Sequence, residues 1–67
     1  MYEVGQVIEM ISMPDDPDPI LAGTRGTVRA VQRGFRPGEL VLSVAWNNGR
    51  TLNVITPPDV IKVVPNA

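Results

Sequence analysis

The 67-residue chain contains no cysteine and no histidine, and these two absences exclude much of the common chemistry of small proteins. Without cysteine there is no disulfide to stabilise the fold and no thiolate for a zinc site. Without histidine the chain lacks the commonest metal ligand and the commonest general base. No pair of carboxylates and no phosphate-binding loop replaces them. We therefore expect no catalytic residue, no metal and no cofactor, and we predict that the protein is not an enzyme.

Long apolar runs and aromatic residues are also scarce. The apolar residues make up 43% of the chain but are dispersed, and none of their runs could span a bilayer. The N-terminus lacks the basic start and apolar stretch of a signal peptide. There is one Trp, one Tyr and one Phe to build a core. We expect one domain over residues 1–67, cytoplasmic and without membrane contact, stabilised by a closed barrel or by assembly into a homo-oligomer.

The strongest structural signal is a hairpin around the only tryptophan. Every second residue from Leu40 to Trp46 is large and apolar, which places these side chains on one face of a strand. Asn48 and Gly49 follow, and this dipeptide predicts a two-residue type I′ turn. The chain would return antiparallel from Arg50. The sequence thus predicts a hairpin that carries the tryptophan on its buried face.

Short apolar stretches separated by Gly and Pro predict an all-β fold of five strands, with no room for a helix. The uneven spacing of Val28 and Val31 predicts a bulge near Arg29 or Ala30. Residues 23–26 read as a tight turn whose two glycines can take positive φ, and residues 56–59 as a short 3₁₀ turn. The predicted strands are 6–13, 27–32, Leu40–Trp46, 50–55 and 60–64.

The net charge of −1 disguises an uneven distribution. Residues 1–23 carry five carboxylates and no cation, whereas residues 24–54 carry five arginines and one glutamate. The simplest interpretation is that the two regions neutralise each other within the fold. The near-zero net charge also argues against a dedicated nucleic-acid binder, because such domains are usually basic.

The arginines form the first candidate site, for a small anion or a nucleotide. Arginine is suited to bidentate contact with phosphate or carboxylate, and an aromatic ring between arginines can stack on a base. Arg25 and Arg50 are the first choice, because each lies next to a predicted turn. The alternative for the aromatic segment is a mobile loop whose ring covers the end of the barrel. The predicted ligand-binding residues are Arg25, Arg29, Arg33, Phe35, Arg36 and Arg50.

The proline-rich acidic segment 14–19 forms the second candidate site. Asp15, Asp16 and Asp18 lie in a stiff loop that could contact a partner protein or simply be solvated. A hard cation is a third alternative, but the segment lacks the glycine and the distal glutamate of an EF-hand. We therefore predict a protein contact here and no metal site.

Three stretches together resemble a family of small proteins of unknown function from phages and bacterial mobile elements. They are residues 13–20 (MPDDPDPI), 23–28 (GTRGTV) and 44–52 (VAWNNGRTL). The layout of strands also looks like a five-stranded SH3-like barrel, and GTRGTV is similar to the start of a KOW module. The segment 33–42 departs from the family because it is longer than usual. The resemblance implies a fold and a mobile-element setting, without a mechanism.

Together these observations predict a non-enzymatic binding module. The setting implied by the resemblance makes a phage or mobile-element accessory protein our first hypothesis. It would act in counter-defence, by binding a host protein or by sequestering a small anionic ligand such as a nucleotide. The alternative is a KOW-like nucleic-acid-binding module.

Overall fold

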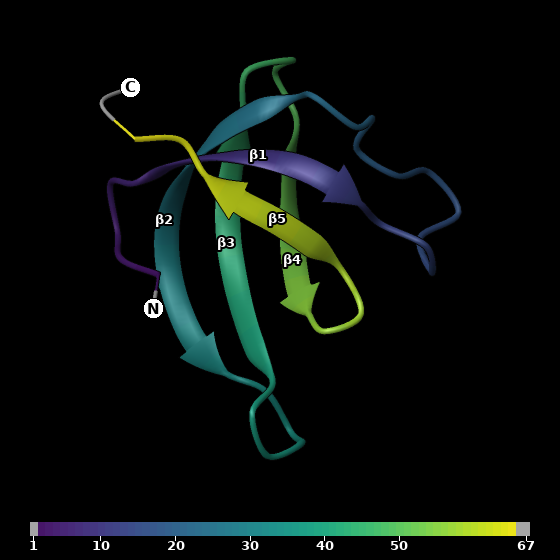
Figure 1. The fold of residues 1–67 in the computed structure, drawn as a ribbon, viewed down its shortest axis with the longest axis vertical. Coiled ribbons are helices and arrows are strands. Elements are labelled where there is room, and N and C mark those ends of the chain that lie inside the picture. The colour runs from purple at the N-terminus through teal and green to yellow at the C-terminus, as the bar shows by residue number, and fades with distance from the viewer. Residues whose placement is uncertain (1, 66–67) are drawn as a thin grey trace.

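The computed structural model describes residues 2–65, and all the regular structure in this part of the chain is β-strand (Figure 1). The five strands form one antiparallel sheet in the order β4-β3-β2-β1-β5. No helix long and apolar enough to cross a bilayer occurs in these residues. The strands are β1 (Val7–Ser12), β2 (Arg25–Arg33), β3 (Leu40–Trp46), β4 (Thr51–Thr56) and β5 (Val60–Val63).

The all-β class and the five predicted strands are therefore confirmed, with boundaries that differ by one or two residues. The strands β2, β3 and β4 form a meander, and β1 lies between β2 and the C-terminal strand β5 (Figure 1). The two edges of the sheet, β4 and β5, are not hydrogen-bonded to each other within residues 2–65. Closure into a barrel stays a prediction.

The core lies on one face of the sheet. Alternation could not decide which face of β1 points inward, and the structure shows that Ile8 and Met10 are fully buried there. Two residues of the loop before β2, Met13 and Ile20, also enter the core, whereas neighbouring Leu21 is exposed. Among residues 2–65, the buried apolar residues of the core are Ile8, Met10, Met13, Ile20, Val28, Leu42, Val44, Trp46, Val54 and Ile61.

The predicted bulge in β2 is confirmed. Val28 pairs with Val44 of β3, but Ala30 pairs with Ser43, so that Arg29 is the extra residue. Because side chains alternate along a strand, the extra residue restores Val31 to the inner face opposite Leu42.

The predicted turn at residues 23–26 is confirmed at Gly23, which has a φ of 91°, but is wrong at Gly26. It lies inside β2, opposite Trp46, and is buried against the indole ring. A Cβ at this position would lie 2.8 Å from Trp46 Cε3. Glycine is therefore needed for close packing under the tryptophan and not for positive φ.

The hairpin after Trp46 forms as predicted, but its turn has three residues and not two. Trp46 N–H donates to the Arg50 carbonyl at 2.8 Å, and Gly49 N–H donates to the Trp46 carbonyl at 3.1 Å. Gly49 has a φ of 88° and completes the loop of residues 47–49. This matches a type I turn followed by a left-handed residue, which an Asn-Asn-Gly segment suits as well as it suits a type I′ turn.

The β4–β5 connection is not the predicted 3₁₀ turn. A 3₁₀ turn over residues 56–59 would require the Asp59 N–H to donate to the Thr56 carbonyl, and it donates to Ile55, one residue further back. Asp59 closes the connection instead. Its N–H donates to the Ile55 carbonyl, and its carboxylate Oδ2 accepts the Ile55 N–H, both at 2.9 Å.

Candidate functional site

Arg25, a first choice for an anion site, already has a carboxylate partner. Its Nε lies 3.3 Å from Glu9 Oε1, and the other oxygen of Glu9 lies 3.5 Å from Lys62 Nζ. These residues are direct neighbours across β2, β1 and β5 on the outer face of the sheet. The three side chains form a cross-strand charge ladder. Arg25 therefore takes part in holding the sheet together.

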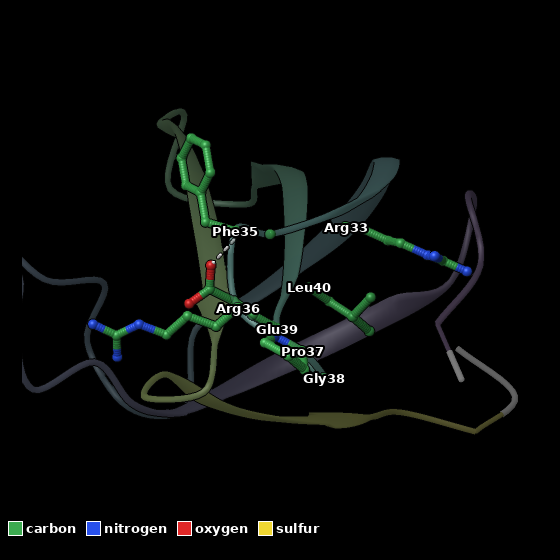
Figure 2. Close-up of a pocket in the computed structure, with 8 residues that line it drawn as sticks. Arg33, Phe35, Arg36, Pro37, Gly38, Glu39 and Leu40 are labelled. Atoms are coloured by element: carbon green, nitrogen blue, oxygen red, sulfur yellow. Dashed lines mark hydrogen bonds between the residues drawn. The ribbon is translucent and has the colours of Figure 1, made fainter.

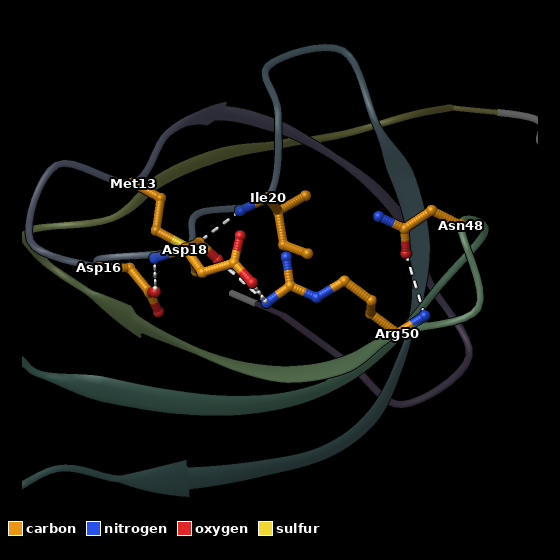
Figure 3. Close-up of polar contacts among 6 residues, drawn as sticks. All are labelled: Met13, Asp16, Asp18, Ile20, Asn48 and Arg50. Carbon is orange, nitrogen blue, oxygen red and sulfur yellow. Dashed lines mark hydrogen bonds and ion pairs between the residues drawn. The ribbon is translucent and has the colours of Figure 1, made fainter.

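Arg50 also has a partner, in the proline-rich segment 14–19 that we call the acidic loop (Figure 3). One guanidinium nitrogen, Nη2, donates to the Asp18 carbonyl oxygen at 3.0 Å and lies 3.6 Å from Asp18 Oδ2. Within the loop, Asp16 Oδ1 accepts the Asp18 N–H at 2.8 Å. Ile20 N–H lies 3.5 Å from Met13 Sδ, beside the core. The contact between Arg50 and Asp18 ties the acidic loop to the β3–β4 turn. It also pairs one carboxylate of the acidic N-terminal region with one arginine of the region 24–54.

Arg25 and Arg50 do lie at the same end of the sheet, which the sequence could not decide. Asn47 N–H donates to the Arg25 carbonyl, and Trp46 N–H donates to the Arg50 carbonyl, so both residues flank the β3–β4 turn. Their guanidinium groups pair with different acids, Glu9 and Asp18. The anion site proposed for them stays a prediction, and an incoming anion would have to compete with these carboxylates.

The other three arginines have no ion pair within residues 2–65. Arg29 is the exposed extra residue of the β2 bulge. Arg33 ends β2, and Arg36 lies in the loop that follows, both of them exposed. In the described part of the chain, the unpaired positive charge is therefore concentrated along β2 and the β2–β3 connection.

The β2–β3 connection, residues 34–39, is an ordered loop that we call the Phe35 loop. Glu39 N–H donates to the Arg36 carbonyl at 3.0 Å, and Gly38 has a φ of 78°. Proline in the second position of such a turn and a positive-φ glycine in the third define a type II turn. At the base of the loop, Gly34 N–H donates to the Glu39 carbonyl at 2.8 Å. The Pro37-Gly38 dipeptide was the signal for this turn in the sequence.

Glu39 also fixes the backbone of the only phenylalanine. Its Oε1 accepts the Phe35 N–H at 3.0 Å, so the carboxylate spans the loop from one side to the other (Figure 2). The Phe35 side chain itself is fully exposed and makes no contact with the core. The alternative in which this ring covers the end of the barrel is therefore wrong. An aromatic side chain stands in solvent on a loop held by several hydrogen bonds.

The Phe35 loop borders a concave surface of about 610 Å³ that residues 33–40 line. In Figure 2 the side chains of Arg33 and Arg36 extend to opposite sides of the loop, and the Phe35 ring points away from both. The predicted set of two arginines and one aromatic ring is thus close in the chain but does not converge on one point. This geometry presents a projecting ring with a cation on each flank.

The acidic loop contributes to a second, smaller cavity of about 240 Å³ beside β4. Asp15 and Asp16 line it together with Asp59, and Asn53 and Ile55 form its β4 side. No group of three or more His, Cys, Asp or Glu side chains in residues 2–65 is arranged to hold a metal ion. Asp18 does not line the cavity, because its carboxylate faces Arg50.

Asp59 is the one charged side chain in residues 2–65 that is buried. Burial raises the pKa of its carboxyl group above the ordinary value, and the nearby Asp16 and Asp15 raise this pKa further. The hydrogen bond from Ile55 N–H opposes both effects without cancelling them. Asp59 did not stand out in the sequence, since an Asp after two prolines is an ordinary turn residue.

We expect the Asp59→Asn variant to change the pH dependence of stability. The folded protein holds the Asp59 proton more tightly than the unfolded chain does. Stability from this group is therefore complete below the unfolded pKa, near 4, and is lost as pH rises through the higher folded pKa. Urea denaturation between acid and neutral pH should show the wild type losing stability relative to Asp59→Asn across this window.

The Asp15→Asn/Asp16→Asn double variant provides the control for this titration. Removing the two nearby charges should bring the pKa of Asp59 closer to its ordinary value, as observed by NMR titration of the carboxyl carbon. A parallel pH dependence for the wild type and Asp59→Asn would contradict the expected role of burial.

The comparisons with known proteins identify a family but no function. A family model described as a domain of unknown function, DUF4314, matches residues 1–64. No curated protein and no solved structure shows a significant match to the chain. The match agrees with the resemblance of the sequence to a domain family of unknown function, and it extends over almost the whole chain. The chain therefore belongs to the DUF4314 family.

Proposed function

We propose that this chain is a non-enzymatic binding module that docks onto a partner protein through the Phe35 loop. The observation that carries the proposal is a fully exposed phenylalanine on a loop whose backbone is fixed by Glu39. A large apolar side chain in water contributes nothing to the stability of the fold, whereas its burial in a partner would be favourable. An ordered loop also loses little conformational freedom when it binds.

The composition of the loop supports a protein as the partner. Aromatic residues and arginine are enriched in protein interfaces, and Phe35 stands between Arg33 and Arg36. Because the two arginines extend to opposite sides of the ring, they suit a rim of charge around an apolar anchor. They are less suited to clasp one small anion, since that requires convergent groups.

The wider setting comes from resemblance. We propose that the five strands form an SH3-like barrel that stays open between its two edges, β4 and β5, and that the protein serves a phage or mobile element by binding a host defence protein in the host cytoplasm. The support is the likeness of three stretches of the sequence to small proteins of such elements, which is an argument by analogy. The family assignment is compatible with it and states no function.

A second candidate is a single-stranded nucleic acid or a nucleotide, which would stack on the Phe35 ring. Arg29, Arg33 and Arg36 make no ion pair within residues 2–65 and could contact phosphates. Such binding would weaken steeply with salt, because each phosphate contact releases counterions. Docking of an apolar ring into a protein pocket would depend much less on salt.

The test compares the Phe35→Ala variant with Leu21→Ala, a matched control at another exposed apolar residue. Proteins captured from a bacterial lysate by the wild type would be identified and purified, and their dissociation constants measured by calorimetry. Truncation of an anchor residue of this kind typically weakens binding about 30-fold or more. We expect this loss for Phe35→Ala, an intermediate loss for Glu39→Ala, and no change for Leu21→Ala.

The same calorimetry would include single-stranded oligonucleotides and linear and cyclic nucleotides at two salt concentrations. Salt-sensitive binding that depends on Phe35 would establish the second candidate in place of the first. Equal affinity of the partner for the wild type and Phe35→Ala would overturn both, since each places the ring at the contact.

A further inference from the structure

The strand β4 is an edge of the sheet, and one side of its backbone faces away from β3. In an antiparallel pair, successive residues alternate between bonding to the neighbouring strand and pointing away from it. The bond from Trp46 N–H to the Arg50 carbonyl sets the phase of this alternation. Leu52 and Val54 therefore face β3, whereas Thr51, Asn53 and Ile55 direct their N–H and C=O groups outward.

Of these three residues, Ile55 is the one whose outward backbone groups have hydrogen-bond partners within residues 2–65. Both backbone groups of Ile55 bond to Asp59, at 2.9 Å each, which also confirms the phase. No hydrogen bond from another segment of residues 2–65 reaches the outward groups of Thr51 and Asn53. Two donors and two acceptors are thus left along the edge, with the spacing that an added strand would meet.

The cavity beside this edge is negatively charged. Asp15, Asp16 and Asp59 line it with Asn53 and Ile55, and no basic residue takes part in the lining. The acids act on one another, since Asp15 and Asp16 raise the pKa of Asp59. A cation placed in this cavity would therefore be stabilised by several carboxylates at once.

We propose that the edge of β4 binds an extended basic peptide from a partner protein by strand addition at Thr51 and Asn53, with a Lys or Arg side chain in the acidic cavity. Backbone pairing gives such complexes their affinity, and pockets for alternate side chains give them specificity. The edge and the cavity are separate features of the chain, and each selects part of the same ligand. The proposal does not depend on the Phe35 loop, so failure of either leaves the other standing.

Charge favours this partner over a second copy of the chain. Two β4 edges paired together would bring two acidic cavities onto one small sheet. The other edge of the sheet, β5, carries one cation, Lys62, and its amine is already 3.5 Å from Glu9. Within residues 2–65, neither edge of another copy therefore supplies an available basic side chain.

The experiment uses capped hexapeptides that alternate valine and threonine and carry one lysine at each position in turn. Matched peptides carry glutamate or norleucine at the same place. Binding is measured by fluorescence anisotropy, and amide hydrogen exchange is followed by NMR. We expect the lysine peptides to bind about tenfold or more tightly than the glutamate peptides. We also expect slower exchange at Thr51 and Asn53 and no change along β5.

Variants separate the edge from the cavity. Asp15→Asn/Asp16→Asn should remove the preference for lysine, and Asp18→Asn should keep it, because Asp18 faces Arg50 and does not line the cavity. Asn53→Pro removes one outward N–H without touching the bonds to β3, so it should weaken all the peptides alike. If Asn53→Pro fails to fold, N-methylated peptides provide the same test of backbone pairing.

Three results would overturn the proposal. The first is that none of the peptides binds at millimolar concentration. The second is equal binding of lysine, norleucine and glutamate peptides to the wild type. The third is protection of Thr51 and Asn53 without peptide in a protein that sediments as a dimer, which would assign the edge to a second copy.

Discussion

The Gly26→Val substitution is expected to abolish cooperative folding. A Cβ at position 26 would lie 2.7 Å from Val44 Cγ1, 2.8 Å from Trp46 Cε3 and 2.9 Å from the Ala45 carbonyl oxygen. The first two atoms belong to the core and the third to the backbone of β3, so none can move without disturbing the sheet. Overpacking costs about 1–3 kcal/mol per site, and more where backbone is displaced.

That loss is large for a domain of this size. A chain of 67 residues has a free energy of unfolding of about 3–10 kcal/mol. We expect Gly26→Ala to lose about 2–3 kcal/mol and Gly26→Val to show no cooperative urea transition by circular dichroism. Ala30→Val, on the same strand but away from the core, should change stability by less than about 0.5 kcal/mol. Similar stabilities for Gly26→Val and Ala30→Val would contradict this expectation, because they would show that β3 can shift to make room for the added side chain.

The Trp46→Ala substitution should lower the free energy of unfolding by about 3–5 kcal/mol. Trp46 is buried between β2 and the core, and its Nε1–H donates to the Leu52 carbonyl at 3.1 Å. Truncation removes both the packing and the hydrogen bond and leaves a cavity. Trp46→Phe keeps much of the packing, so it should lose about 1–2 kcal/mol. Urea denaturation followed by circular dichroism measures both, because the fluorescent residue is removed.

Phe35→Ala is the matched control, because it also truncates an aromatic side chain. Since Phe35 is fully exposed, its loss should alter the free energy of unfolding by less than about 0.5 kcal/mol. The pair of substitutions thus separates the aromatic residue that builds the fold from the one that we propose for binding. A comparable loss of stability for Phe35→Ala and Trp46→Ala would contradict that division.

Periodicity predicted most of the fold. The alternation from Leu40 to Trp46 predicted β3 without error, and the uneven spacing of Val28 and Val31 located the bulge. The turns were harder to predict. Gly26 has the sequence context of a turn residue, but it lies inside a strand, where its lack of a side chain allows contact with the indole ring. Such a contact lies between strands and leaves no trace in local sequence.

The candidate site was predictable in its residues but not in its geometry. Phe35, Arg33 and Arg36 stood out by type, whereas their divergence depends on the turn that Pro37 and Gly38 form. The partners of Arg25 and Arg50 lie 16 and 32 residues away, beyond any local pattern. Because the pairing of charges is decided by topology, composition alone could not tell an available arginine from an occupied one.

The pairing of β1 with β5 has a consequence for how the protein folds. Ile8 is opposite Val63, and Val64 N–H donates to the Val7 carbonyl at 2.9 Å, so this ladder joins segments about fifty residues apart. The β2–β3–β4 meander forms through two local hairpins and closes only short loops. Since the entropy of loop closure must be lost before distant contacts form, we expect the meander to form early. We expect the docking of β1 and β5 to limit the rate of folding, so that the core around Ile8 is completed last.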